Sequence, residues 1–262
     1  MTGELPAMHA ATLDKILSVV KDDPRIEALL GGGSMIHGGF DAQSDLDLVL
    51  VVRADDYADV MAGRRAIAAR IGGLLAAFTG EHVGEPRLLI CLFGPPLIHV
   101  DLKFVLATDL QRMVEHPRLL WARQPARIAA ILDAAHVQWP DRDAQWFEDR
   151  VWIWLHYCAA KLLRGELIEA LAMLTWLREM VLGPMLHRRA GRPQRGVRRI
   201  EGDAVAAAAL GTTLATPDTA AIAQALRCAA DLYLDLRQDD PPPRPTPRMP
   251  DALRAYVRPL AP

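Results

Sequence analysis

A glycine-rich turn followed by two closely spaced carboxylates constrains this chain more than any other feature. Gly32-Gly33-Ser34 is followed by ten residues, then by Asp45-Leu46-Asp47 and the apolar run Leu48–Val52. A short, continuous run rich in β-branched residues predicts a buried strand. Because side chains alternate along a strand, we expect Asp45 and Asp47 on one side of it, about 7 Å apart at the backbone.

Two neighbouring carboxylates repel each other and are costly to remove from water. A divalent cation relieves both costs, and oxygen ligands of this kind suit Mg²⁺. The N–H groups of a glycine turn can hold phosphate. The stretch therefore predicts a Mg²⁺ site beside a phosphate-binding turn, which is typical of nucleotide chemistry.

A third acidic candidate, Asp101, lies in the predicted strand His99–Phe104. Alternation places His99, Asp101 and Lys103 on one face and apolar side chains on the other. If this strand neighbours Leu46–Val52, Asp101 completes a cluster of three carboxylates. It would then bind a metal ion or accept a proton from an attacking hydroxyl. The alternative is that Asp101 caps a turn or pairs with Lys103, and that His99 only hydrogen-bonds in the sheet.

The bulk properties narrow the class of protein. The 262 residues, half of them hydrophobic, fit one large domain or two modest ones, and the formal net charge of -2 argues against a nucleic-acid partner. Cys91, Cys158 and Cys228 are widely spaced without metal-binding spacing, so we expect buried thiols in a reducing compartment. Neither a secretory signal nor a membrane span is recognised, so a cytoplasmic location is expected.

Periodicity predicts an α+β chain. In the first half we expect a helix over 10–21, strands over 26–30, 46–52, 87–93 and 98–105, and one long helix over 54–78, with Gly72-Gly73 as a candidate bend. These elements predict a small mixed β-sheet covered by helices. In the second half we expect helices over 143–163, 166–187, 203–210, 217–236 and 251–257. The predicted layout is an α/β domain over 1–140 and a helical bundle over 141–262, with a cleft between them.

The order Gly-Ser, spacer, Asp-x-Asp in a strand, and a later lone Asp in a strand resembles the DNA polymerase β-type nucleotidyltransferase superfamily. The chain length and the helical second half resemble the aminoglycoside nucleotidyltransferases within it. The segment Tyr157–Leu167 is similar to the helix and turn that follow the catalytic domain in streptomycin- and lincosamide-type members. The resemblance implies a catalytic domain over 1–140 and a substrate-binding helical domain over 141–262.

The resemblance also implies roles for single residues. Gly33 and Ser34 would hold the β- and γ-phosphates of a nucleoside triphosphate. Asp45 and Asp47 would bind Mg²⁺, and Asp101 would be the third carboxylate, acting as general base or metal ligand.

In the helical half, Lys161 would reach the triphosphate from the helical domain. Some relatives place a glutamate base one helical turn before that lysine, where this chain has Tyr157. This departure shifts the role of base toward Asp101.

The implied reaction moves a nucleoside monophosphate, AMP from ATP in the first instance, to a hydroxyl of a small molecule such as an aminoglycoside-like antibiotic. Pyrophosphate leaves, with Mg²⁺ as cofactor and ATP or another nucleoside triphosphate as co-substrate. The resemblance also makes a homodimer one option for the oligomeric state. Two other readings stay open: a catalytically silent nucleotide-binding or toxin–antitoxin-type interaction protein, and transfer to RNA or protein.

Several features have both a functional and a structural interpretation. Lys161 is either a phosphate ligand or a solvated residue near a helix C-terminus. The six arginines in 188–199 are either a lid over triphosphate or polyanion, or a solvated loop. Acidic residues of the second half either line a pocket for a cationic acceptor or are ordinary exposed charges; they are Glu148, Asp149, Glu166 and Glu169.

Overall fold

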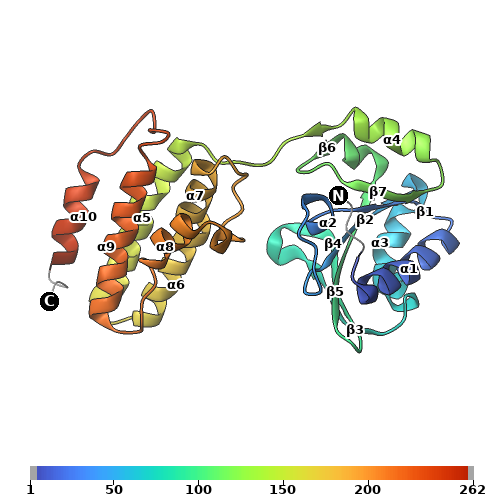
Figure 1. The fold of residues 1–262 in the computed structure, drawn as a ribbon, viewed down its shortest axis with the longest axis horizontal. Coiled ribbons are helices and arrows are strands. Elements are labelled where there is room, and N and C mark those ends of the chain that lie inside the picture. Colours follow the sequence, from blue (N-terminus) through green and yellow to red (C-terminus); the bar gives the residue numbers. More distant parts are fainter. Residues whose placement is uncertain (1–4, 259–262) are drawn as a thin grey trace. The chain divides into compact units, whose positions relative to one another are not determined.

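The computed structural model describes residues 5–258, which form two compact units (Figure 1). One unit ends at Gln138 and the other begins at Trp139. The first contains a six-stranded mixed sheet with helices, and the second is helical. The predicted α+β fold class is therefore confirmed.

The sheet of the first unit has the strand order β3-β4-β5-β2-β1-β7. β2 and β5 run parallel, and the other neighbouring pairs run antiparallel. The strands are β1 (Ile26–Gly31), β2 (Leu46–Val52), β3 (Leu74–Gly80), β4 (Glu85–Phe93), β5 (Ile98–Leu106) and β7 (Arg118–Ala122). The parallel pair occupies the middle of the sheet, where strands are covered on both faces.

Alternating side chains divide the first unit into two cores. Leu46, Leu48 and Leu50 of β2 pack with α1 (Ala7–Asp22) and α3 (Tyr57–Arg70) on one face. Val51 packs on the other face in a smaller core that includes α4 (Pro125–Asp133). The remaining short elements are α2 (Ser34–His37), β6 (Arg112–Met113), β8 (His136–Val137) and 3₁₀ turns over Ala54–Asp56, Glu81–Val83 and Ala107–Gln111. The odd-numbered positions of β2, Asp47 among them, thus share the face with the smaller core.

The prediction of one helix over 54–78 is wrong. α3 ends at Arg70, and Leu74–Gly80 forms the edge strand β3 paired with β4. Gly72 and Gly73 lie between them with φ values of +85° and +77°. Two successive residues with positive φ cannot continue a right-handed helix, so the chain turns back along the sheet.

The second unit is built from helices that enclose one core (Figure 1). They are α5 (Ala144–Leu163), α6 (Leu167–Leu177), a π-helical turn (Arg178–Leu182), α7 (Gly183–Arg189), a 3₁₀ turn (Ile200–Gly202), α8 (Ala204–Gly211), α9 (Thr219–Leu236) and α10 (Met249–Val257). Gly165, with φ +74°, follows the end of α5, and the Glu166 N–H donates to the Lys161 carbonyl oxygen at 3.0 Å. This left-handed cap turns the chain so that α6 packs back against α5.

Two expectations concern the chain as a whole. The three cysteines carry free thiols; Cys91 and Cys158 are buried, and Cys228 is half-buried. Among the described helices, none has both the length and the apolar character that crossing a membrane requires.

Candidate active site

Asp47 and Asp101 lie side by side on neighbouring strands. In the parallel pairing of β2 with β5, Leu46 is opposite Val100 and Asp47 is opposite Asp101. Both carboxylates therefore project from the same face of the sheet, as side-chain alternation predicts. The two strands supply a pair of acidic groups from positions more than fifty residues apart in the sequence.

The glycine turn packs directly against this pair. The Gly32 N–H donates to the Asp47 carbonyl oxygen at 2.8 Å. Gly33 has φ +54°, and a Cβ atom built on it would lie 1.8 Å from Asp47 Oδ2. Only a residue without a side chain allows both this backbone conformation and this position of the carboxylate. Ser34, 6% exposed, follows immediately at the start of α2.

The surroundings of Asp101 favour its protonated form. Burial raises the pKa of Asp101, and the negative charge of Asp45 adds to that rise. His99 opposes it through a contact of 2.9 Å between its Nε2 and Asp101 Oδ1. A carboxylate with raised proton affinity is suited to accept a proton from a hydroxyl group.

The carboxylates provide oxygen donors of the kind that Mg²⁺ prefers. Across residues 5–258, however, no three His, Cys, Asp or Glu side chains converge closely enough to hold a metal ion. The described site is thus a pair, Asp47 and Asp101, with Asp45 near enough for its charge to act on Asp101. Two adjacent carboxylates beside a glycine turn fit a small divalent cation by their charge and donor chemistry.

A group of residues beside the pair was not predicted as part of a site. Glu85 Oε2 lies 2.7 Å from Lys103 Nζ, and Glu85 Oε1 lies 2.7 Å from Arg87 Nε. The hydrogen bond from Arg87, followed by the contact with Lys103, lowers the pKa of Glu85 to about 2, although burial by itself would raise it. Lys103, two residues after Asp101 on the same strand face, is the only sequence signal that pointed to this group.

Lys161 belongs to the second unit, where it has two acidic partners. Its Nζ lies 2.8 Å from Glu166 Oε2 and 3.0 Å from Glu169 Oε2. The hydrogen bonds that the Lys161 ammonium donates to these two carboxylates raise its pKa. It also lies 5.1 Å from the centre of the Tyr157 ring, whose hydroxyl donates to Glu169. These contacts keep the ammonium group charged, and its role toward phosphate stays a prediction.

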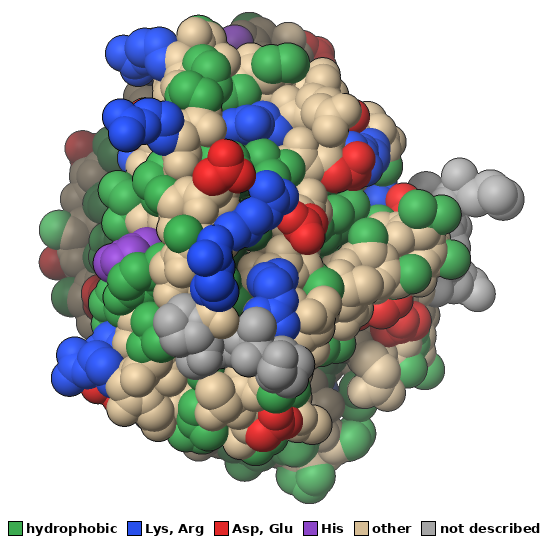
Figure 2. Space-filling view, turned by 90° about the vertical axis from the view of Figure 1, so that its left-hand side faces the viewer, with side chains coloured by type: hydrophobic (Ala, Val, Ile, Leu, Met, Phe, Trp, Pro, Cys, Tyr) green, Lys and Arg blue, Asp and Glu red, His purple; other side chains and the backbone are tan. Residues whose placement is uncertain are grey.

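At least three of the six arginines in the arginine-rich segment have carboxylate partners within the second unit. Arg188 pairs with Asp240, Arg189 pairs with Asp235 and Asp239, and Arg192 pairs with Asp203. On the face shown in Figure 2, basic and acidic side chains are likewise interspersed. Because these arginines already have carboxylate partners, the contacts favour the structural interpretation over a polyanion-binding lid.

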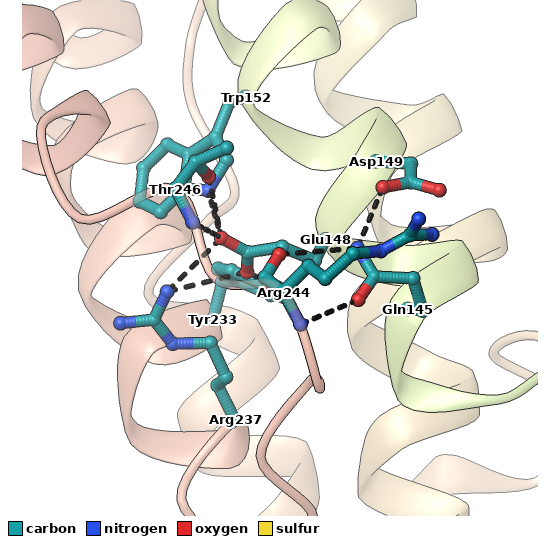
Figure 3. Close-up of polar contacts among 8 residues, drawn as sticks. All are labelled: Gln145, Glu148, Asp149, Trp152, Tyr233, Arg237, Arg244 and Thr246. Carbon is teal, nitrogen blue, oxygen red and sulfur yellow. Dashed lines mark hydrogen bonds and ion pairs between the residues drawn. The ribbon is translucent and has the colours of Figure 1, made fainter.

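Glu148 is not an exposed charge, contrary to one of the two expectations for it. The residue is 1% exposed, and its carboxylate accepts hydrogen bonds from Trp152, Tyr233, Arg237 and Thr246 (Figure 3). Both of its carboxylate oxygens therefore accept from protein donors. Glu148 joins α5 and α9 to the proline-rich segment before α10 and is unavailable to a cationic acceptor.

Comparisons with known proteins do not assign a family. No family model matches the chain, and no curated protein matches it. Among solved structures, the chain is similar to the crystal structure of an aminoglycoside 6-adenyltransferase from Bacillus subtilis. The identity is 14%, the match covers 95% of this chain and 97% of that one, and the TM-score is 0.40. A likeness of this size identifies neither activity nor substrate.

Proposed function

We propose that this chain is a Mg²⁺-dependent nucleotidyltransferase that moves a nucleoside monophosphate, with AMP from ATP as first candidate, to a hydroxyl of a small molecule. The observation that carries the proposal is the register of Asp47 with Asp101 beside Gly33. A carboxylate pair in contact with a glycine turn brings oxygen ligands for a cation and backbone N–H donors for a phosphate group together.

The reaction would proceed by in-line displacement at the α-phosphorus. The acceptor hydroxyl oxygen forms a bond to that phosphorus, and the bond from it to the bridging oxygen breaks, so pyrophosphate leaves. Asp101 would take the hydroxyl proton, for which its raised pKa suits it. Asp45 and Asp47 would hold Mg²⁺, whose positive charge would stabilise the phosphate oxygens.

The glycine turn would bind the leaving group. The N–H of Gly33 and the hydroxyl of Ser34 are the candidate donors to the β- and γ-phosphates. The helical unit would hold the acceptor, which we propose to be a small hydroxylated molecule of aminoglycoside-like character, and Lys161 would contribute charge toward the triphosphate. In this proposal, 1–140 is the catalytic domain and 141–262 the substrate-binding domain.

Substitution of Asp45 tests the metal and the chemistry together. Asp45→Asn should keep the fold but abolish Mg²⁺-dependent turnover of the triphosphate, whereas the nearby exposed change Gln43→Ala should leave turnover intact. Titration calorimetry should show ATP binding that weakens when Mg²⁺ is chelated. ATP binding without a metal requirement and without turnover would instead identify a catalytically silent nucleotide-binding protein.

A further inference from the structure

A cavity of about 610 Å³ opens in the first unit on the same face of the sheet as the carboxylate pair. Its floor is apolar and comes from three neighbouring strands: Leu30 of β1, Val49 of β2 and Val105 of β5. Its wall is the segment 108–117, which follows β5 and includes β6. A cavity of this volume accommodates a ligand the size of a nucleoside or larger.

The cavity adjoins the candidate active site through three residues. Val49 and Lys103 line it, and they follow Asp47 and Asp101 by two positions on the same strand faces. Gly32 also lines it, and the Gly32 N–H is bonded to the Asp47 carbonyl oxygen. A ligand with a phosphate at the carboxylate pair can therefore extend along the sheet into the cavity without leaving this unit.

The charges of the cavity limit its occupant. Six ionisable residues line it, three acidic and three basic: Glu85, Arg87, Lys103, Asp109, Arg112 and Glu115. Glu85 is paired with both Arg87 and Lys103, and Arg87 Nη1 lies 3.4 Å from Asp109 Oδ1. The lining therefore has no excess of carboxylates that would bind a polycationic acceptor. It also has no excess of basic side chains that would bind a triphosphate.

The remaining chemistry suits a neutral ring system with a polar edge. The branched side chains of Leu30, Val49 and Val105 offer apolar contact to a flat group. Thr108 and Gln111, exposed residues of the wall, offer a hydroxyl and an amide that both donate and accept hydrogen bonds. This combination matches the base and ribose of a nucleotide better than its phosphates or a charged acceptor.

We propose that this cavity binds the nucleoside part of the nucleoside triphosphate, so that residues 108–117 decide which nucleotide the protein uses. The identification of the ligand as a nucleoside rests on the proposed function, whereas the cavity itself does not. The proposal assigns nucleotide selection to the first unit, and the acceptor would bind at other surfaces of the protein.

The test measures binding of adenosine, guanosine, cytidine and uridine to the full chain by calorimetry, without phosphate and without Mg²⁺. At least one nucleoside should bind, and Val49→Phe, which fills the cavity floor, should weaken that binding about tenfold or more. The matched control Val83→Phe places the same ring at a residue that is 63% exposed and lies outside the cavity, so it should not change binding. Gln111→Ala, at the wall, should change the order of preference among the four nucleosides.

The outcomes separate the cavity from the catalytic proposal. Absence of binding tighter than about 1 mM by all four nucleosides, or equal binding by Val49→Phe and wild type, would overturn the inference. If Val49→Phe fails to fold, judged by thermal unfolding, an unchanged nucleoside preference in Gln111→Ala would overturn it. Asp45→Asn should bind nucleoside as wild type does. In the wild type, nucleoside binding without triphosphate turnover would support the cavity as a nucleoside site and contradict the proposed function. Turnover without nucleoside binding would support the proposed function and contradict the cavity as a nucleoside site.

Discussion

Replacing Glu148 by glutamine should destabilise the second unit and change how its stability depends on pH. The Glu148 side chain is fully buried, and it accepts hydrogen bonds from Trp152 Nε1 at 3.0 Å, from the Thr246 N–H at 2.8 Å and from Arg237 Nη1 at 3.2 Å. Tyr233 donates to its other oxygen (Figure 3). A glutamine would present an NH₂ group to one set of these donors and would leave Arg237 without its carboxylate partner.

The magnitude follows from the pKa of Glu148. Burial alone would raise the pKa, but the hydrogen bonds from Thr246, Tyr233 and Trp152 outweigh burial and lower it from 4.5 to about 2. Because the folded pKa lies below the unfolded one, the stabilisation is fully present above about pH 4.5 and is lost as the pH falls through 2. A shift of this size corresponds to about 3 kcal/mol near neutral pH and to roughly 1.4 kcal/mol near pH 3.

Urea unfolding monitored by tryptophan fluorescence measures this difference, because five of the six tryptophans lie in the second unit. Glu148→Gln should lose about 3 kcal/mol relative to wild type near pH 7, and the gap should narrow to about half near pH 3. Asp149→Asn is the matched control. Its exposed carboxylate accepts a hydrogen bond from Gln145, and the variant should stay within about 0.5 kcal/mol of wild type. An unchanged stability of Glu148→Gln, or an equal deficit at both pH values, would refute the reasoning.

Two further predictions concern the glycine turn and the helical unit. Gly33→Ala should reduce nucleotidyl transfer about 10²-fold because the new Cβ would displace the Asp47 carboxylate. Gly38→Ala, with φ +78° and open space where its Cβ would lie, should share the backbone strain but keep activity. Equal activities in the two variants would contradict the role of Gly33. Lys161→Ala should raise the KM for the triphosphate about tenfold with little change in unfolding. The control Arg164→Ala, which also removes an ion-pair partner of Glu166, should leave this KM unchanged. A wild-type KM in Lys161→Ala would restrict the role of that residue to its ion pairs.

Local patterns were sufficient to predict the centre of the sheet. The apolar run Leu48–Val52 and the alternation through His99–Phe104 each identify a strand, and strand alternation places Asp47 and Asp101 on one face once the strands are neighbours. The neighbouring position itself was a hypothesis, because register between distant strands depends on packing that no local pattern encodes.

The errors arose where distant contacts overrule local preference. The Leu-, Ala- and Phe-containing segment Leu74–Gly80 has good helix formers, yet pairing with β4 and the preceding Gly72 and Gly73 make it a strand. Residues 108–117, which form the wall of the cavity, show no regular hydrophobic period and lie between β5 and β7 in the sequence.

Glu148 illustrates the same limit for a single side chain. Its local sequence is that of an amphipathic helix, in which an isolated glutamate is expected at the surface. Three of its four donor residues, Tyr233, Arg237 and Thr246, are 85 to 98 positions away in the sequence. Burial of this carboxylate becomes evident only when α9 and the following segment are placed against α5.

The most direct test of the proposed chemistry is to identify the products by mass spectrometry. Wild-type protein with Mg²⁺, ATP and a panel of aminoglycosides, lincosamides and cell metabolites should yield an acceptor that has gained one nucleoside monophosphate, together with an equal amount of pyrophosphate. Asp47→Asn should yield neither while unfolding like the wild type. Release of inorganic phosphate in place of pyrophosphate, or the same products from Asp47→Asn, would contradict nucleotidyl transfer at the Asp47–Asp101 pair.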